Sequence, residues 1–375
     1  MSDRVLRPGL LAALAFLFPA LAAAEPGATL LDLPFAASAL RAPGSEVAVA
    51  VATSGLLPLA RPKAGSREAP AGEGAPVAVA WGEAGGAALT LVDGQVRVTL
   101  LGREAVEGLA AAETPRGALP GLPRAVSGGL SAVLAEPVAV PGRAGQGAGR
   151  LVIRERQPVP MSAEPKAVPV ATATVSPAPD AAFAARSPVL TVFDGRPTVV
   201  VVTENEAGSS LAVAQAAEAG WSVRARGPAA PGRPLQVAGI ADFSGSGRPQ
   251  IAVTGPADGA ARLRLWTYEG GALQPAQAAS GQDIVAPGYD AAAPGEGGPG
   301  LSALLSRDGG VDLALPVADR SALAILSFKG GLVERARVPL PAPAAFGVAT
   351  LGTGPEARLL VGLADGRIAV VNPTP

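Results

Sequence analysis

The sequence predicts an all-β fold built from repeated four-stranded antiparallel sheets, and three observations support this. Short apolar strands recur about every 50 residues in the second half of the chain, a spacing typical of propeller blades. Glycine and proline, 48 and 38 of the 375 residues, punctuate these strands. Stretches with the 3.6-residue apolar period of a helix are few. We therefore expect a β-propeller of about seven blades with Pro/Gly-rich loops and little helix.

The first segment, residues 1–24, has the layout of a secretory signal peptide. Arg4 and Arg7 precede an apolar run from Leu10 to Leu21, and Ala22–Ala24 supply small residues for cleavage. The run is interrupted by Pro19 and is shorter than the roughly 20 residues of a membrane span. We expect cleavage after Ala24, and a soluble mature chain that is periplasmic or secreted.

We treat the mature chain, residues 25–375, as one domain. Its charge and the residue types that it lacks exclude several classes of function. The whole chain has 30 basic and 31 acidic residues, and without Asp3, Arg4 and Arg7 of the first segment the mature chain has 28 and 30, a net charge of −2 that offers no electrostatic basis for nucleic-acid binding. Cysteine is absent, so stability must come from the core or from bound ions. Histidine is absent too, which removes the commonest general base and metal ligand. A monomer is expected.

The clearest repeats lie in residues 188–375. Each has a continuous apolar strand, expected to be buried on both faces between blades. These strands are Pro197–Thr203, Pro249–Gly255, Val311–Val317 and Ala357–Leu363. The predicted strands before them are Val189–Phe193, Leu235–Ala241, Leu301–Ser306 and Phe346–Leu351. The strands after them are Ser210–Gln215, Gly220–Arg226, Arg262–Tyr268, Gly271–Gln277, Ala322–Phe328, Gly331–Val338 and Arg367–Asn372.

Across the whole chain, three dipeptides are expected to supply the positive φ of tight hairpin turns: Asp93-Gly94, Asp194-Gly195 and Asp365-Gly366.

The first half of the chain repeats less regularly than the second. Predicted strands in the first half are Glu46–Thr53, Val77–Trp81, Ala88–Val92, Gln95–Leu101, Leu130–Val140 and Arg150–Arg156. Residues 157–188 are rich in proline and alanine and are interpreted as a linker or long surface loop within the domain. Arg61–Pro76 and Tyr289–Gly300 are interpreted as further surface loops.

The end of the chain predicts how the ring closes. The last repeat stops after its third strand, and an open strand edge invites aggregation. An early strand, Thr29–Leu33 or Glu46–Ala52, is therefore expected to complete the final blade.

One polar turn, between the predicted strands Leu235–Ala241 and Gln250–Thr254, carries recognisable chemistry. Its sequence, DFSGSGRPQ from Asp242 to Gln250, resembles the calcium loop of FG-GAP repeats, an integrin-α-like family also called VCBS-type. That family has the pattern D-x-D-x-D-G-x-x-D between two strands of a propeller blade. The resemblance implies a backbone carbonyl ligand at Arg248 and side-chain ligands at Asp242, Ser244, Ser246 and Gln250.

The departures from that pattern argue against a metal. Calcium affinity follows the number of carboxylates, and three of the four expected carboxylates are Ser244, Ser246 and Gln250 here. We expect a turn formed by Gly245 and Gly247 that has lost its metal, with at most weak, millimolar calcium binding. No other cofactor is expected.

We expect a non-catalytic binding or scaffolding module for a protein or polysaccharide partner in the cell envelope. The alternative is a carbohydrate-active enzyme, a glycosidase or lyase, that uses Asp and Glu residues. No Asp or Glu stands out by spacing, so no catalytic residue is assigned. Trp81, Trp221 and Trp266 lie in predicted strands, where packing is favoured over sugar stacking.

Overall fold

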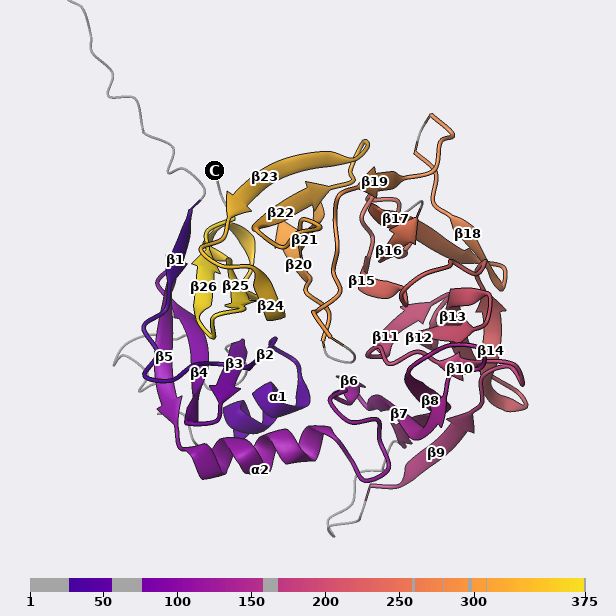
Figure 1. The fold of residues 1–375 in the computed structure, drawn as a ribbon, viewed down its shortest axis with the longest axis horizontal. Coiled ribbons are helices and arrows are strands. Elements are labelled where there is room, and N and C mark those ends of the chain that lie inside the picture. Colours follow the sequence, from indigo (N-terminus) through magenta and orange to yellow (C-terminus); the bar gives the residue numbers. More distant parts are fainter. Residues whose placement is uncertain are drawn as a thin grey trace, which may run out of the picture.

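The computed structural model describes residues 27–55, 76–157, 168–257, 260–278, 280–295, 299–307 and 309–373. The predicted signal peptide, residues 1–24, and most of the predicted loop Arg61–Pro76 lie outside these residues. Within them the chain is a β-propeller, with antiparallel sheets arranged in a ring (Figure 1).

The described residues form six four-stranded blades, numbered here in chain order. Blade 1 contains β2 (Ala39–Arg41), β3 (Val77–Gly82), β4 (Gly85–Val92) and β5 (Gln95–Leu101). Blade 2 contains β6 (Ala125–Ser127), β7 (Leu130–Ala139), β8 (Gln146–Arg156) and β9 (Val170–Val175). Blade 3 contains β11 (Val189–Phe193), β12 (Arg196–Asn205), β13 (Gly208–Ala217) and β14 (Gly220–Arg226).

The remaining blades follow the same order around the ring. Blade 4 contains β15 (Gln236–Ala241), β16 (Gln250–Ala257), β17 (Ala260–Glu269) and β18 (Ala272–Pro275), with β19 (Val285–Pro287) also paired to β17. Blade 5 contains β20 (Ala303–Arg307), β21 (Gly310–Pro316), β22 (Ala322–Ser327) and β23 (Val333–Pro339). Blade 6 contains β24 (Ala344–Leu351), β25 (Arg358–Leu363), β26 (Ile368–Val371) and β1 (Ala28–Leu30), with the short 3-10 helix η1 (Gly354–Glu356) between β24 and β25.

Every strand predicted in residues 188–375 is present, and β11 and β14 have the predicted bounds. The count of six, rather than about seven, is a correction. Dividing the chain length by the size of a blade assumed that the whole mature chain folds into blades. Two helices, α1 (Glu46–Thr53) and α2 (Arg103–Glu113), and long connections use part of that length instead.

The ring closes as predicted through one of the two candidate strands. β1, which overlaps the Thr29–Leu33 candidate at Thr29 and Leu30, pairs antiparallel with β26 and places Ala28 opposite Val371. The other candidate, Glu46–Ala52, was wrong because this segment is helix α1. Ser45 caps the helix by accepting a hydrogen bond from the Ala48 N–H at 3.3 Å. The alternation of Val and Ala also places Val47 and Val51 four residues apart on one buried helix face.

The prediction that residues 157–188 form only a linker or surface loop was also wrong, because the segment contains two strands. Among their described residues, β9 forms the outer strand of blade 2, and a two-residue strand, β10 (Ala182–Phe183), lies between blades 2 and 3. β10 pairs with β8 on one side and β12 on the other, which joins the two blades into one nine-stranded sheet. Its Phe183 is fully buried.

Tight turns follow the predicted chemistry. Asp93 and Asp194 both have positive φ, as do the glycines that follow them, whereas in the third turn only Gly366 does. The central strands are buried along most of their length, as in β12 and β25. Apolar clusters lie between blades 2 and 3, 3 and 4, 4 and 5, 5 and 6, and 6 and 1.

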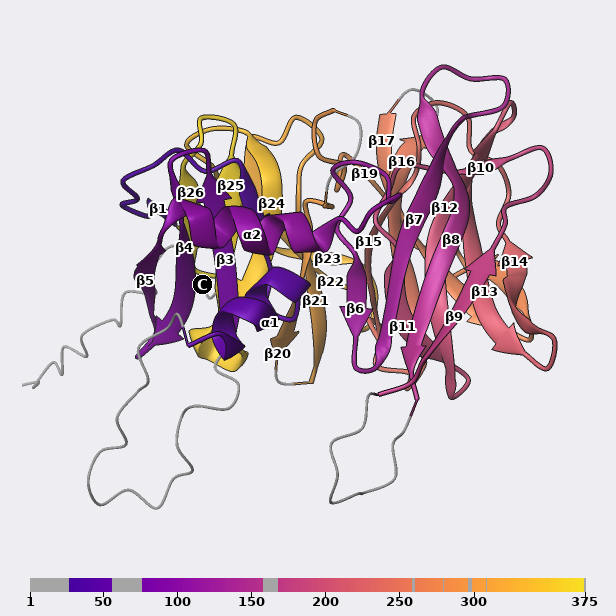
Figure 2. The same ribbon diagram turned by 90° about the horizontal axis from the view of Figure 1, so that it is seen from below.

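The junction between blades 1 and 2 differs, because the two helices lie there. α1 packs on β3, α2 packs on β4, and the helices contact each other, as Figure 2 shows from below. A sixth apolar cluster joins Val47, Val51 and Val106 of the helices to the blade 1 sheet. We call α1 and α2 together the helical wedge. Among the described residues, no helix is long and apolar enough to cross a membrane.

Candidate functional site

A groove with a volume of about 550 Å³ lies between blades 3 and 4. Three chain segments form it: the β11–β12 turn, the end of the β15–β16 loop and the β17–β18 turn. All three lie at the same end of the blades because each joins antiparallel strands in the same direction. The lining residues are Val192, Phe193, Asp194, Gly195, Gly247, Arg248, Pro249, Thr267, Tyr268, Glu269 and Gly270.

Tyr268 gives the groove a rigid aromatic wall. Its ring packs against Phe193 with the ring centres 5.4 Å apart. Its hydroxyl donates to the Oε1 of Gln215 at 2.9 Å, and the Nε2 of Gln215 donates to the Thr198 Oγ1 at 2.7 Å. Burial raises the pKa of the Tyr268 hydroxyl above its usual value. The phenol is therefore a neutral, internally bonded group whose apolar ring contributes to the groove.

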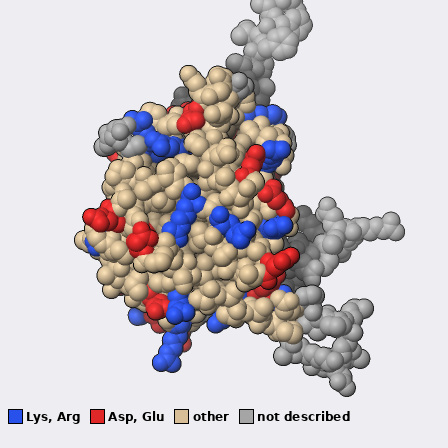
Figure 3. Space-filling view, turned by 90° about the vertical axis from the view of Figure 1, so that its right-hand side faces the viewer, with Lys and Arg blue, Asp and Glu red and all other residues tan. Residues whose placement is uncertain are grey.

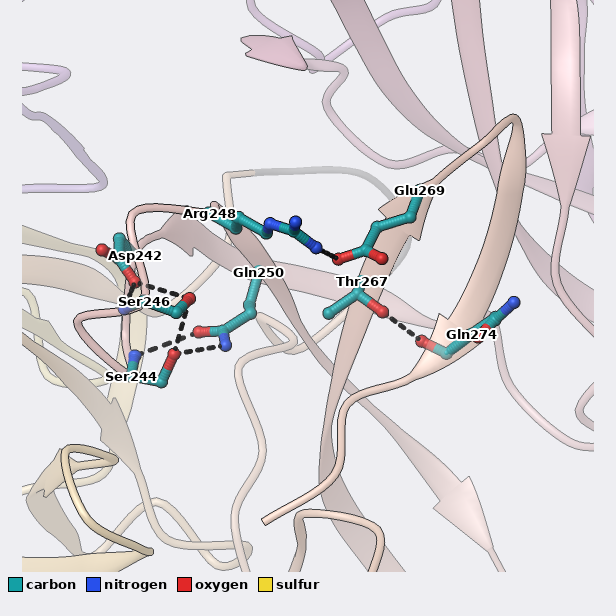
Figure 4. Close-up of polar contacts among 8 residues, drawn as sticks. All are labelled: Asp242, Ser244, Ser246, Arg248, Gln250, Thr267, Glu269 and Gln274. Atoms are coloured by element: carbon teal, nitrogen blue, oxygen red, sulfur yellow. Dashed lines mark hydrogen bonds and ion pairs between the residues drawn. The ribbon is translucent and has the colours of Figure 1, made fainter. Parts of the chain in front are cut away.

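Charged side chains line the rim of the groove. Arg248 Nη1 lies 2.6 Å from Glu269 Oε1, and both side chains are more than half exposed. Asp194 lines the groove from the blade 3 side (Figure 4 shows the blade 4 side). The side of the ring drawn in Figure 3 carries Lys and Arg as well as Asp and Glu side chains. Arg224 of β14 and Arg264 of β17 are exposed. The groove thus offers charges of both signs around an apolar wall.

The loop that resembles a calcium site lies between β15 and β16, beside the groove (Figure 4). Asp242 accepts backbone hydrogen bonds, from the Ser246 N–H at 2.9 Å to Oδ1 and from the Gly247 N–H at 2.7 Å to Oδ2. A chain of side-chain bonds runs from Gln250 Nε2 to Ser244 Oγ (2.7 Å), on to Ser246 Oγ (3.1 Å) and then to Asp242 Oδ1 (3.4 Å). Gln250 Oε1 accepts from the Ser244 N–H at 3.1 Å.

These hydrogen bonds make the loop self-contained. Gly245 and Gly247 have φ of 73° and 80°, so the two glycines form the turn as predicted, and Asp242 makes the predicted bonds to the backbone. The donor set does not fit a calcium ion. It has one carboxylate, whose two oxygens already accept N–H groups, and the amide nitrogen of Gln250 points at Ser244. The described residues also contain no cluster of three Asp, Glu, His or Cys side chains that could hold a metal.

The loop is anchored by Phe243, which is 1% exposed and packs edge-on against Phe328 of blade 5 with ring centres 5.2 Å apart. Of the residues expected as calcium ligands, only Arg248 reaches the groove. Asp194 was predicted only as a hairpin-turn residue, and Tyr268 and Glu269 were not predicted as site residues. The available signal was that Asp194-Gly195 and Glu269-Gly270 are turns of adjacent predicted blades.

The three tryptophans pack as expected. Trp266 is 7% exposed in the cluster between blades 3 and 4, and Trp221 packs against the cluster between blades 2 and 3. Trp81 packs against the helical wedge, with the guanidinium of Arg41 4.9 Å from its ring centre.

The sequence matches no protein-family model and no curated protein. Solved structures with similarity include a Trypanosoma rangeli sialidase in complex with sialic acid, at 10% identity and a TM-score of 0.41, covering 79% of this chain and 51% of that one. A second is the β-propeller domain of Myceliophteria thermophila Cps50 (Swd1), at 12% identity and a TM-score of 0.38, covering 77% of this chain and 79% of that one. This chain spans about half the length of the sialidase. The assignment of this chain as a β-propeller comes from its own sheets.

Proposed function

We propose that the protein is an exported, non-catalytic binding module that takes a protein or glycan ligand in the groove between blades 3 and 4. The observation that carries this proposal is the groove itself, with its aromatic wall, its exposed Val192 and its rim of both charges. A volume of about 550 Å³ is within the range of pockets that bind a small ligand or one segment of a larger one.

The chemistry of the groove favours recognition over catalysis. Two of its reactive groups already interact with other side chains of the same protein: the Tyr268 hydroxyl donates to Gln215, and Glu269 forms an ion pair with Arg248. The surface is formed by tight turns, which present backbone and side-chain groups in a fixed geometry without a large rearrangement.

The alternative is a carbohydrate-active enzyme, and one observation favours it. Asp194 and Glu269 line the same groove, and a pair of carboxyl groups is the usual requirement for hydrolysis of a glycosidic bond. The experiment below separates the two functions.

The test measures binding and cleavage with the same ligands. Residues 25–375 are applied to arrays of envelope polysaccharides and peptides, and each bound ligand is titrated by biolayer interferometry. We expect Val192→Asp and Arg248→Ala to weaken binding about tenfold or more, because they remove apolar contact and rim charge. Arg150→Ala is the matched control, since it breaks another ion pair of two largely exposed side chains, with Glu136, on blade 2.

Binding that is the same in the groove variants and the control contradicts the groove as the ligand site. Ligands recovered after incubation are also analysed for cleavage products. Cleavage that is lost in Glu269→Gln or Asp194→Asn supports the enzyme and contradicts the binding module.

The proposal includes the resemblance to FG-GAP repeats. It is supported by the position of the Asp242–Gln250 loop between two strands of blade 4, since that family carries its loop between two strands of a propeller blade. In this chain the loop serves the groove through Arg248 and Pro249.

A further inference from the structure

One face of blade 2 is not covered by a neighbouring blade. In the β7–β8 pair, Ala132 and Leu134 lie opposite Ile153 and Leu151, and these four side chains pack in the cluster toward blade 3. The intervening residues therefore point to the other face, toward blade 1. At that junction the helical wedge replaces direct packing of sheet on sheet.

A cavity of about 80 Å³ lies on this face. Its floor is formed by alternate residues of β7, Ser131, Val133 and Ala135, and by Val152 and Arg154 of β8. Its wall is the segment from Pro115 to Arg124, which connects α2 to β6. Since one water molecule takes up about 30 Å³ in the liquid, the cavity has room for a group of a few heavy atoms.

The connecting segment is held in place by main-chain hydrogen bonds. The Leu119 N–H donates to the Leu134 carbonyl at 2.9 Å, and the Glu136 N–H donates to the Gly117 carbonyl at 3.1 Å. The Arg124 N–H donates to the Glu113 carbonyl at 3.0 Å, which ties the segment to the end of α2. The wall of the cavity is thus part of the folded framework.

Three arginines are among the residues that line this small space: Arg116, Arg124 and Arg154. Arg124 pairs with Glu46 of α1 at 3.0 Å, with its side chain 21% exposed, and is therefore positioned by the wedge. Arg116 and Arg154 are exposed, and in the described part of the chain no ion pair is formed by either. With Glu46 neutralising one of the three charges, the cavity keeps an excess of positive charge.

We propose that this cavity is an oxyanion-binding site, at which Arg116 and Arg154 bind a phosphate, sulfate or carboxylate group that Arg124 attracts from the wall. Arginine presents a planar fork of donors that matches two oxygens of such a group, and such charge-assisted bonds are among the strongest in proteins. The Ser131 hydroxyl adds a donor on the floor, and Val133 and Val152 exclude water from one side. The site is separate from the groove between blades 3 and 4 and does not depend on the function proposed for it.

The test uses inorganic phosphate, inorganic sulfate and glucuronate as separate probes, titrated by calorimetry at low ionic strength into residues 25–375. At least one probe is expected to bind with a stoichiometry of one. Arg154→Gln and Arg116→Gln are each expected to weaken it about tenfold, because each removes a charge-assisted contact. Arg154→Lys, which keeps the charge but not the fork, is expected to fall between.

Arg156→Gln is the matched control, because Arg156 is an exposed arginine of the same strand that does not line the cavity. Tighter binding of phosphate or sulfate identifies a tetrahedral anion, and tighter binding of glucuronate identifies a carboxylate. The proposal is overturned if no probe binds, or if Arg156→Gln weakens binding as much as Arg154→Gln does. Circular dichroism of each variant checks that the fold is retained.

Discussion

A single carboxylate, Asp242, shows how one residue can keep the shape of a loop while its neighbours change the chemistry. Its two oxygens receive the N–H groups of Ser246 and Gly247, which fixes the turn in the absence of any ion. Ser244 and Gln250, where the family pattern has aspartate, bond to each other instead. Hydrogen bonding thus does in this loop what metal coordination does in the family it resembles.

This loop predicts a specific response to calcium. Millimolar calcium is expected to leave the melting temperature of the natural sequence unchanged, since one charge cannot offset dehydration of the ion. The triple variant Ser244→Asp, Ser246→Asp, Gln250→Asp restores the carboxylates. It should gain about 1.4 to 2.7 kcal/mol when calcium exceeds its dissociation constant about 10- to 100-fold.

Thermal unfolding with and without calcium measures both. Magnesium at the same concentration is the control, because it demands a tighter octahedral shell than this flexible loop offers. Retention of stoichiometric calcium by the natural sequence after dialysis contradicts the prediction.

At the scale of elements, an ion pair between Glu113 and Arg41 connects the helical wedge to the blade 1 sheet. Glu113, at the end of α2, is 2% exposed, and its Oε2 lies 2.8 Å from the Nε of Arg41 on β2. Burial raises the pKa of the Glu113 carboxyl above its ordinary value, and Arg41 opposes that rise. Glu46 of α1 adds a further increase. The wedge therefore contains a carboxyl group that resists ionisation.

The raised pKa sets the sign of a pH dependence. Because the folded state favours the protonated form, Glu113 stabilises the fold fully below its ordinary pKa, near 4.5. That contribution is lost as the pH rises through the raised value. The free energy of unfolding of the natural protein, minus that of Glu113→Gln, should therefore fall as the pH rises from 4.5 and then level off.

Urea denaturation of both proteins between acidic and neutral pH measures this difference. A difference between the natural protein and Glu113→Gln that is constant over this range argues against a raised pKa.

The strands could be predicted from the sequence because a buried strand needs only a short apolar run and a turn at each end. The wedge could not, because the alternating Val and Ala residues of α1 fit a strand period and a helix face equally well. β9 and β10 lie among prolines, and they are held as strands by pairing with β8 and, for β10, also with β12, rather than by a local pattern. The groove could not be predicted from the sequence because its residues come from three turns that lie far apart in the chain.

For the whole molecule, closure of the ring depends on the pairing of β1 with β26. That pairing covers Ala28, Thr29 and Leu30 opposite Val371, Val370 and Ala369. It continues past the strand, where the Leu31 N–H donates to the Ile368 carbonyl at 2.9 Å. Ile368 is fully buried, so its carbonyl has little access to water.

The variant Leu31→Pro tests this closure, because proline has no N–H to donate to the Ile368 carbonyl. The buried Ile368 carbonyl then lacks its partner, and the free energy of unfolding is expected to fall by about 1–3 kcal/mol. Leu31→Ala retains the N–H and separates the loss of the side chain from the loss of the bond. Deletion of residues 25–52 should lower the melting temperature much further. Equal stability of Leu31→Pro and Leu31→Ala would show that the bond does not hold the ring closed.

The pairing of β1 with β26 also has a consequence for how the molecule is made. The first strand of the ring is synthesised long before the last, and Ala28 has no partner until Val371 is available. Contacts between such distant residues carry the largest loop-closure entropy and form slowly. Ring closure is therefore expected to be the final and slowest step of folding, completed only after the whole chain has been released.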